Sequence, residues 1–198
     1  TMKKIVFVLF FVCFVVSDVV EYSFPQLRDH TNSQDQSTFT QYYWVNEDYY
    51  QDGGPTLVYL SSMALPQVDL TRSAVSDWGQ DLKAVLIELQ VRYSGDSLPS
   101  TNFTSNEFAY QSPTQNIEDI VSLQQQFFSI FPQYSDSPWI LIGEYLNANY
   151  VIWARQSYPS NFLGAVGIAG PVLAIEEFPE YFQYWSTIAT EECAAPIH

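Results

Sequence analysis

The chain has 198 residues, 47% of them hydrophobic and 17% aromatic, which is enough apolar material for a sizeable core and excludes a disordered or fibrous protein. It carries 22 acidic residues against 7 basic ones, a formal net charge of −15. A surface of this charge repels nucleic acid and anionic lipid, so we expect no nucleic-acid partner. The length fits one domain or part of a larger one.

Residues 2–17 have the pattern of a secretory signal peptide. Lys3 and Lys4 form a basic start, residues 5–16 are an unbroken apolar run, and Val15 and Ser17 suit a small-residue cleavage site. The apolar run is shorter than the roughly 20 residues of a membrane-spanning helix. We therefore expect cleavage rather than a retained anchor, entry into the secretory pathway, and no membrane span after cleavage.

Two features further along the chain fit the secretory route. Asn102-Phe103-Thr104 is an N-glycosylation sequon, which makes Asn102 the predicted glycosylation site. With Cys13 removed in the signal, Cys193 would be left unpaired, and an oxidising compartment would favour a partner in another chain or in further sequence. Glu191 and Glu192 beside Cys193 lack histidine or cysteine companions, so we expect no metal and no cofactor.

Strand and helix patterns alternate along the rest of the chain. We expect a strand-rich segment at residues 39–50, a turn at 52–55, buried strands at 56–60, 84–89, 139–142 and 163–168, and helices at 67–83, 113–131 and 148–157. Ser112 can cap the second helix, Pro113 suits its first position, and Gln115 can complete a capping box. This alternation predicts parallel β–α–β units.

The segment Ile142-Gly143-Glu144-Tyr145-Leu146-Asn147 joins a predicted strand to a predicted helix. A sharp turn in this setting is what a nucleophile elbow requires, because it lifts one side chain above the sheet edge. We expect that residue to be Glu144, where a hydrolase would carry serine. A carboxylate nucleophile would still need a base to activate water, and the chain holds only His30 and His198.

The simpler interpretation of Glu144 is a solvated carboxylate, or one that pairs with Arg92 or Arg155. Asp96 and Ser97 look like a catalytic pair, but their loop composition favours a role in forming a turn.

Four segments in order carry the motifs of one enzyme family. Asp29-His30 with residues 38–46 (TFTQYYWVN) looks like "DH…TFxQRYwvN", residues 92–99 (RYSGDSLP) look like "EHRyYGeSlP", residues 114–119 (TQNIED) look like "seQALaD", and residues 153–172 look like "aWxRxkYP…GAvaSSaPV". Together, over residues 26–193, they resemble the prolylcarboxypeptidase and dipeptidyl-peptidase family of lysosomal serine exopeptidases. These are α/β-hydrolases that cleave next to proline.

The resemblance also implies where the family's active-site residues would lie. Its elbow reads "GGSYsG", and alignment on Tyr145 puts the serine at Glu144, with Tyr145 as a possible oxyanion amide. Its "GGEG" loop looks like a degenerate oxyanion loop here, Ser62, Met63 and Ala64 after Ser61. The family's "EH" has become Gln90-Val91. The resemblance implies that the triad aspartate and histidine lie beyond His198.

We therefore expect a partial α/β-hydrolase: a mostly parallel sheet flanked by helices, with a signal peptide at 1–17, the amino-terminal part of the domain at 18–198, and the C-terminal part and lid missing. No catalytic site is expected to be intact. The predicted function is that of an inactive homologue or fragment of a secreted or lysosomal exopeptidase. Two alternatives remain, a secreted peptide-binding module and a piece of a longer active peptidase. An uncovered sheet edge would favour self-association.

Overall fold

The computed structural model describes residues 19–62, 70–102, 104–173, 175–176, 178–190 and 193. The predicted signal peptide, together with Met63 and Ala64 of the expected oxyanion loop, lies outside the described residues. Within the described part, no helix is both long and apolar enough to cross a membrane.

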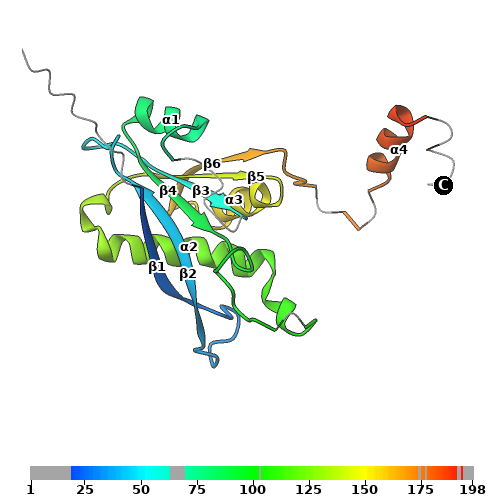
Figure 1. Cartoon of the computed structure of the whole chain (residues 1–198), viewed down its shortest axis with the longest axis horizontal. Coiled ribbons are helices and arrows are strands. Elements are labelled where there is room, and N and C mark those ends of the chain that lie inside the picture. Colours follow the sequence, from blue (N-terminus) through cyan, green and yellow to red (C-terminus); the bar gives the residue numbers. More distant parts are fainter. Residues whose placement is uncertain are drawn as a thin grey trace, which may run out of the picture.

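Six strands form one sheet in the described part of the chain, in the order β1-β2-β4-β3-β5-β6 (Figure 1). The strands are β1 (Val20–Leu27), β2 (Thr38–Asn46), β3 (Thr56–Ser61), β4 (Val85–Gln90), β5 (Trp139–Glu144) and β6 (Phe162–Ile168). β1, β2 and β4 pair antiparallel, whereas β4, β3, β5 and β6 pair parallel. The mostly parallel sheet expected from the sequence is confirmed.

Among the described residues, four α-helices accompany the sheet: α1 (Ala74–Leu82), α2 (Pro113–Ile130), α3 (Leu146–Ser157) and α4 (Pro179–Ile188). α2 and α3 cover one face and α1 lies on the other, while α4 stands apart from the body of the molecule (Figure 1). Two short 3₁₀ turns, Glu107–Tyr110 and Pro132–Tyr134, flank α2. α1, α2 and α3 each lie between two successive parallel strands in the chain, which is the crossover connection that parallel strands need.

The predicted strands correspond to the most deeply buried segments. Every residue of β3 and of β4 is buried, because helices cover both faces of these central strands. The large core between the sheet and α2 and α3 includes Leu123, Phe127 and Trp139, and the rings of Phe127 and Trp139 meet edge to face with centroids 5.7 Å apart. β1 was not predicted, because its sequence is polar and aromatic without an apolar run.

The helix starts follow from local capping. Ser112 accepts a hydrogen bond from the Gln115 backbone N–H, so the predicted start of α2 is confirmed. α1 begins at Ala74, later than the expected residue 67, where Ser73 and Ser76 form a reciprocal capping box.

A fully buried ion pair joins the end of β4 to α2. Arg92 donates from Nε to Asp119 Oδ2 at 2.7 Å and from Nη2 to Asp119 Oδ1 at 2.6 Å. Its remaining N–H groups donate to the backbone carbonyls of Arg28 and Tyr110 at 3.0 and 2.9 Å and of Leu27 at 3.1 Å. A bidentate pair with all its donors used can be held without water.

The same carboxylate fixes the loop between β1 and β2. His30 Nε2 lies 2.9 Å from Asp119 Oδ1. Gln115 Oε1 accepts from the His30 N–H at 2.9 Å, and Gln115 Nε2 donates to Asp29 Oδ1 at 2.6 Å. The expected capping box through the Gln115 side chain is therefore wrong, because that amide binds the loop instead of its own helix end.

The Asp119→Asn substitution should destabilise the fold by about 3–5 kcal/mol, because it leaves the Arg92 guanidinium buried without a counter-charge. Urea denaturation would measure the change in the free energy of unfolding. The matched control is Glu118→Gln on the next position of α2, where the side chain is half-buried and accepts from the Tyr158 hydroxyl. Equal losses from the two substitutions would contradict a special role for the Arg92–Asp119 pair.

Candidate active site

The predicted strand–turn–helix is present at the carboxyl end of β5. β5 ends at Glu144, α3 begins at Leu146, and Tyr145 alone makes the turn with φ 51° and ψ −121°. A positive φ with this ψ is uncommon for a residue with a side chain and costs about 1–3 kcal/mol. The side chain of Tyr145 is 69% exposed. The strained residue at the tip of the elbow is thus Tyr145.

This geometry differs by one position from the expected one. Glu144 is still paired with Ile168 across the parallel ladder, so it remains a half-buried strand residue and the chain reverses only after it. In the pattern G-x-S-x-G of nucleophile elbows, the lifted residue is the third. Counted from Gly143, the third residue is Tyr145.

Gly143 explains how the turn can be so tight. A Cβ added at Gly143 would lie 2.5 Å from the Asn147 carbonyl oxygen and 2.9 Å from the Ala148 nitrogen. These are backbone atoms of the first turn of α3, which cannot move aside independently. The helix therefore starts directly over the end of the strand only because position 143 has no side chain.

The elbow is fixed to the neighbouring strands by its own polar groups. The Tyr145 N–H donates to the Ile168 carbonyl of β6 at 2.9 Å. Asn147 Nδ2 donates to the Leu60 carbonyl at 3.0 Å and to Ser62 Oγ at 2.8 Å. Asn149 Nδ2, one turn into α3, donates to the Pro171 carbonyl at 2.8 Å. The ends of β3, β5 and β6 thus converge on the start of α3.

Two of these bonds bear on the expected oxyanion hole. The Tyr145 N–H, the possible oxyanion amide, donates to the Ile168 carbonyl of β6. Ser62, the part of the expected oxyanion loop that the structure describes, is exposed and accepts from Asn147. Sequence reasoning missed Asn147. The signal was its place as the second glycine of the G-x-S-x-G pattern, where a side chain is unusual.

Glu144 has neither of its expected cationic partners. Arg92 is committed to Asp119, and Arg155 Nε donates to the Leu163 carbonyl at 3.1 Å. None of the ion pairs between described residues includes Glu144. Its charge acts on Tyr59 of β3, whose pKa is raised mainly by burial and further by Glu144 and Glu88.

Of the other singled-out residues, Ser97 and His30 have structural roles, whereas Asn102 and Cys193 lie at the surface. The Ser97 N–H donates to the Ser94 carbonyl at 3.0 Å and closes a turn through Asp96, as expected, while Ser97 Oγ donates to Gln90 Oε1 at 2.8 Å. His30, the one histidine among the described residues, belongs to the buried Arg92–Asp119 network. Asn102 is exposed, and Cys193 is exposed and free.

Gly143→Ala should destabilise the fold by about 2–3 kcal/mol or more, because the added methyl group overlaps backbone atoms of α3. Gly164→Ala on β6 is the matched control, since a Cβ there would meet nothing within 4 Å. Thermal unfolding of the two variants would compare them. A Gly143→Ala protein as stable as Gly164→Ala would show that the elbow is not this tight.

Tyr145→Gly should stabilise the fold by about 1 kcal/mol. Glycine adopts positive φ without the strain of about 1–3 kcal/mol that a side chain incurs, and this gain exceeds its entropic cost of about 0.5–1 kcal/mol. Little packing is lost, since the ring is largely exposed. Chemical denaturation would test the change, and a clear loss of stability would contradict the strained turn.

Comparisons with known proteins agree with this architecture. Residues 26–197 match the model of the family described as serine carboxypeptidase S28. A putative serine protease of Caenorhabditis elegans is 28% identical over 191 residues, which is 91% of this chain and 36% of that protein. The human thymus-specific serine protease is 30% identical, covering 79% of this chain and 31% of its own. Human lysosomal Pro-X carboxypeptidase is 24% identical over a region that covers 88% of this chain and 38% of that protein.

The chain thus spans about a third of the length of these relatives. Among solved structures, a prohormone-processing carboxypeptidase of Saccharomyces cerevisiae aligns with a TM-score of 0.56 at 13% identity, over 89% of this chain and 44% of that one. A Rhodococcus hydrolase aligns with a TM-score of 0.54 at 10% identity, and the alignment covers 86% of this chain and 54% of that one. These likenesses show the α/β-hydrolase fold. The chain belongs to the serine carboxypeptidase S28 family.

Proposed function

We propose that this protein is a non-hydrolysing member of the S28 family that binds peptides at the carboxyl edge of its sheet, with Tyr145 in the place of the nucleophilic serine. The observation that carries the proposal is the strained turn at Tyr145 between β5 and α3. An elbow presents one side chain to the reacting carbonyl. Here that side chain ends in a phenol, whose oxygen lies at the far end of a ring and cannot take the place of a serine Oγ.

The surroundings of the elbow also argue against hydrolysis. A hydroxyl nucleophile needs an imidazole to accept its proton and a carboxylate to orient the imidazole. The histidine of the described residues, His30, is bound to Asp119, which is itself paired with Arg92. Glu144 is a strand residue whose charge acts on the buried Tyr59. A carboxylate is ordinarily a far weaker base than the phenolate it would have to generate, so Glu144 is a poor activator of the Tyr145 phenol.

The proposed ligand is a peptide that contains proline. Support comes from the relatives, one of which is named as a lysosomal Pro-X carboxypeptidase. The alternative is that this chain is a piece of a longer, active peptidase. Membership of the S28 family and the names of the relatives favour this alternative.

The proposed location is the secretory pathway, extracellular or lysosomal. A lysosomal relative, the signal-like residues 2–17 and the exposed sequon residue Asn102 support it.

The test combines turnover and binding. The purified chain and its Tyr145→Ser and Glu144→Ser variants would be incubated with a fluorogenic Pro-X peptide. We expect no hydrolysis above buffer from any of the three, since no histidine among the described residues lies beside the elbow. Hydrolysis by the unaltered chain would overturn the proposal. Hydrolysis by Tyr145→Ser alone would show that a base is present and that only the nucleophile has been lost.

Binding would be followed by tryptophan fluorescence with a non-cleavable Pro-X peptide and a matched peptide in which alanine replaces proline. We expect at least tenfold weaker binding of the alanine peptide. If neither peptide binds, the peptide-binding half of the proposal is overturned, and the result of the hydrolysis assay still stands.

A further inference from the structure

The ring of Tyr145 is an exposed aromatic surface on a fixed backbone. Its exposure of 69% is the largest among the large hydrophobic residues of the described part. The Tyr145 N–H donates to the Ile168 carbonyl at 2.9 Å, and the Tyr145 carbonyl accepts from the Ala148 N–H at 3.2 Å. A tyrosine held in this way has only two side-chain torsions left to order, so it offers contact area to a ligand at a small entropic cost.

A second strained residue lies beside the elbow. Ala169, directly after β6, has φ 53°, and Tyr145 has φ 51°. The two are neighbours in space, because the Tyr145 N–H binds the carbonyl of Ile168, the residue before Ala169. A Cβ added at Gly170 would lie only 3.3 Å from the Tyr145 carbonyl oxygen. Strained residues cluster at ligand-binding sites, so this corner of the sheet edge is where a ligand is expected.

Glu144 adds a carboxylate at the same edge. It is half-buried, and none of the ion pairs between described residues includes it. Ile142 packs with Tyr59 on the α1 side of the sheet, and side chains alternate along a strand, so Glu144 points to that side as well. The pKa of Tyr59 agrees, since it is raised first by burial and then by the charge of Glu144. A half-buried carboxylate without a counter-charge favours a cationic ligand.

The spacing of the ring and the carboxylate suits two adjacent residues of a peptide. Consecutive Cα atoms lie about 3.8 Å apart in the protein and in its ligand alike. A proline holds its segment extended and docks on aromatic side chains. Lysine and arginine have flexible stems that carry a positive charge to a neighbouring carboxylate. The net charge of −15 attracts a basic peptide and repels an acidic one.

We propose that Tyr145 and Glu144 select peptides in which a lysine or arginine precedes proline, an assignment that rests on the peptide-binding function proposed above. The proline ring stacks on the Tyr145 ring, and the cationic group pairs with the Glu144 carboxylate. The basic residue precedes proline because, in a peptide that ends Pro-X, the residue after proline carries the terminal carboxylate, which Glu144 repels.

Four non-cleavable peptides would test the assignment by isothermal titration calorimetry. They differ only at two adjacent positions, lysine or norleucine followed by proline or alanine, and each ends one residue later. For the unaltered chain we expect the dissociation constant to rise about tenfold when alanine replaces proline, because a stacking contact is lost. We expect a rise of about threefold or more when norleucine replaces lysine, because an ion pair is lost.

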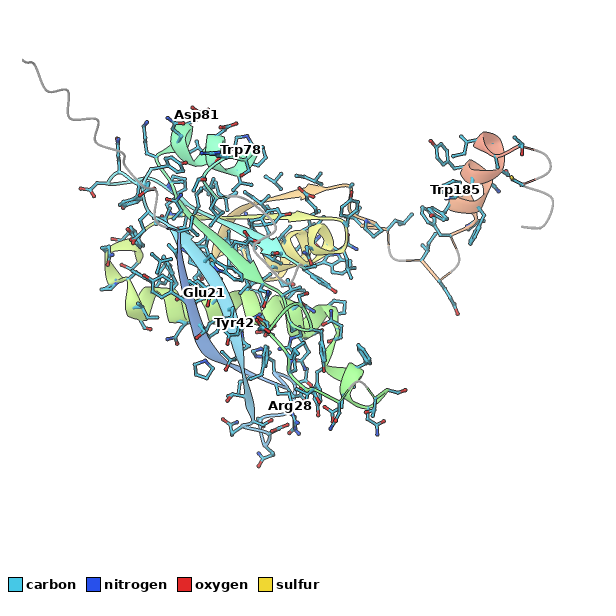
Figure 2. All side chains as sticks on the ribbon, in the orientation of Figure 1. Glu21, Arg28, Tyr42, Trp78, Asp81 and Trp185 are labelled. Carbon is cyan, nitrogen blue, oxygen red and sulfur yellow. The ribbon has the colours of Figure 1, made fainter. Side chains whose placement is uncertain are left out.

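Two substitutions should each remove one preference and keep the other. Tyr145→Leu keeps an apolar side chain without the ring, so the proline preference should fall to about twofold or less. Glu144→Gln keeps the shape without the charge, so the lysine preference should disappear. The matched controls are Tyr184→Leu and Glu180→Gln, at exposed positions of α4, and neither should change a preference. α4, which carries Trp185, stands apart from the body that holds the elbow (Figure 2). Far-UV circular dichroism would confirm that each variant is folded.

Salt provides a second readout. At about 1 M salt charges are screened beyond about 3 Å, so the lysine preference should shrink while the proline preference persists.

The outcomes separate this assignment from the proposed function. A lysine preference that Tyr145→Leu abolishes and Glu144→Gln keeps would place the cation over the ring and overturn the assignment. Variants that keep both preferences would overturn it too. An unaltered chain that binds the proline peptides without preferring lysine would overturn the assignment and leave the proposed function intact. An unaltered chain that binds none of the four peptides would overturn both.

Discussion

The turn from β5 into α3 is the constraint on which the candidate site depends. Position 143 has no room for a Cβ, and Tyr145 adopts a backbone conformation that side chains rarely adopt. Such strain persists only where surrounding contacts outweigh it. Here those contacts are the bonds from Tyr145 and Asn147 to β6 and β3. The elbow therefore keeps its shape whatever side chain stands at its tip.

The second constraint lies away from the elbow. The Arg92–Asp119 pair joins β4 to α2, and His30 and Gln115 extend it to the loop after β1. None of these contacts involves the residue at the tip of the elbow. Because the scaffold is stabilised by a buried ion pair, glycine sites and apolar packing, a serine at the elbow adds little to stability. A family member can therefore lose the nucleophile and keep the fold.

The sequence predicted those parts of the fold that local patterns encode. Apolar runs located β3, β4, β5 and β6, and Ser112 with Pro113 located the start of α2. β1 was missed, because a strand at the edge of the sheet needs no continuous apolar run.

Long-range contacts were not predictable in the same way. The Gln115 side chain could cap its own helix or bind the distant loop, and only the folded chain selects between these. The partner of Arg92, the tip residue of the elbow and the role of Asn147 depend likewise on which segments meet in space. Short alignments were ambiguous by one position at the elbow, where one residue decides which side chain is presented.

The central claim is that an intact elbow presents no reactive hydroxyl. A fluorophosphonate forms a covalent adduct with an activated serine of a hydrolase, because that nucleophile attacks phosphorus as it attacks a carbonyl. Intact-mass spectrometry of the purified chain after such treatment would test the claim most directly. We predict an unchanged mass. A single adduct, on any serine or on the Tyr145 phenol, would contradict the claim.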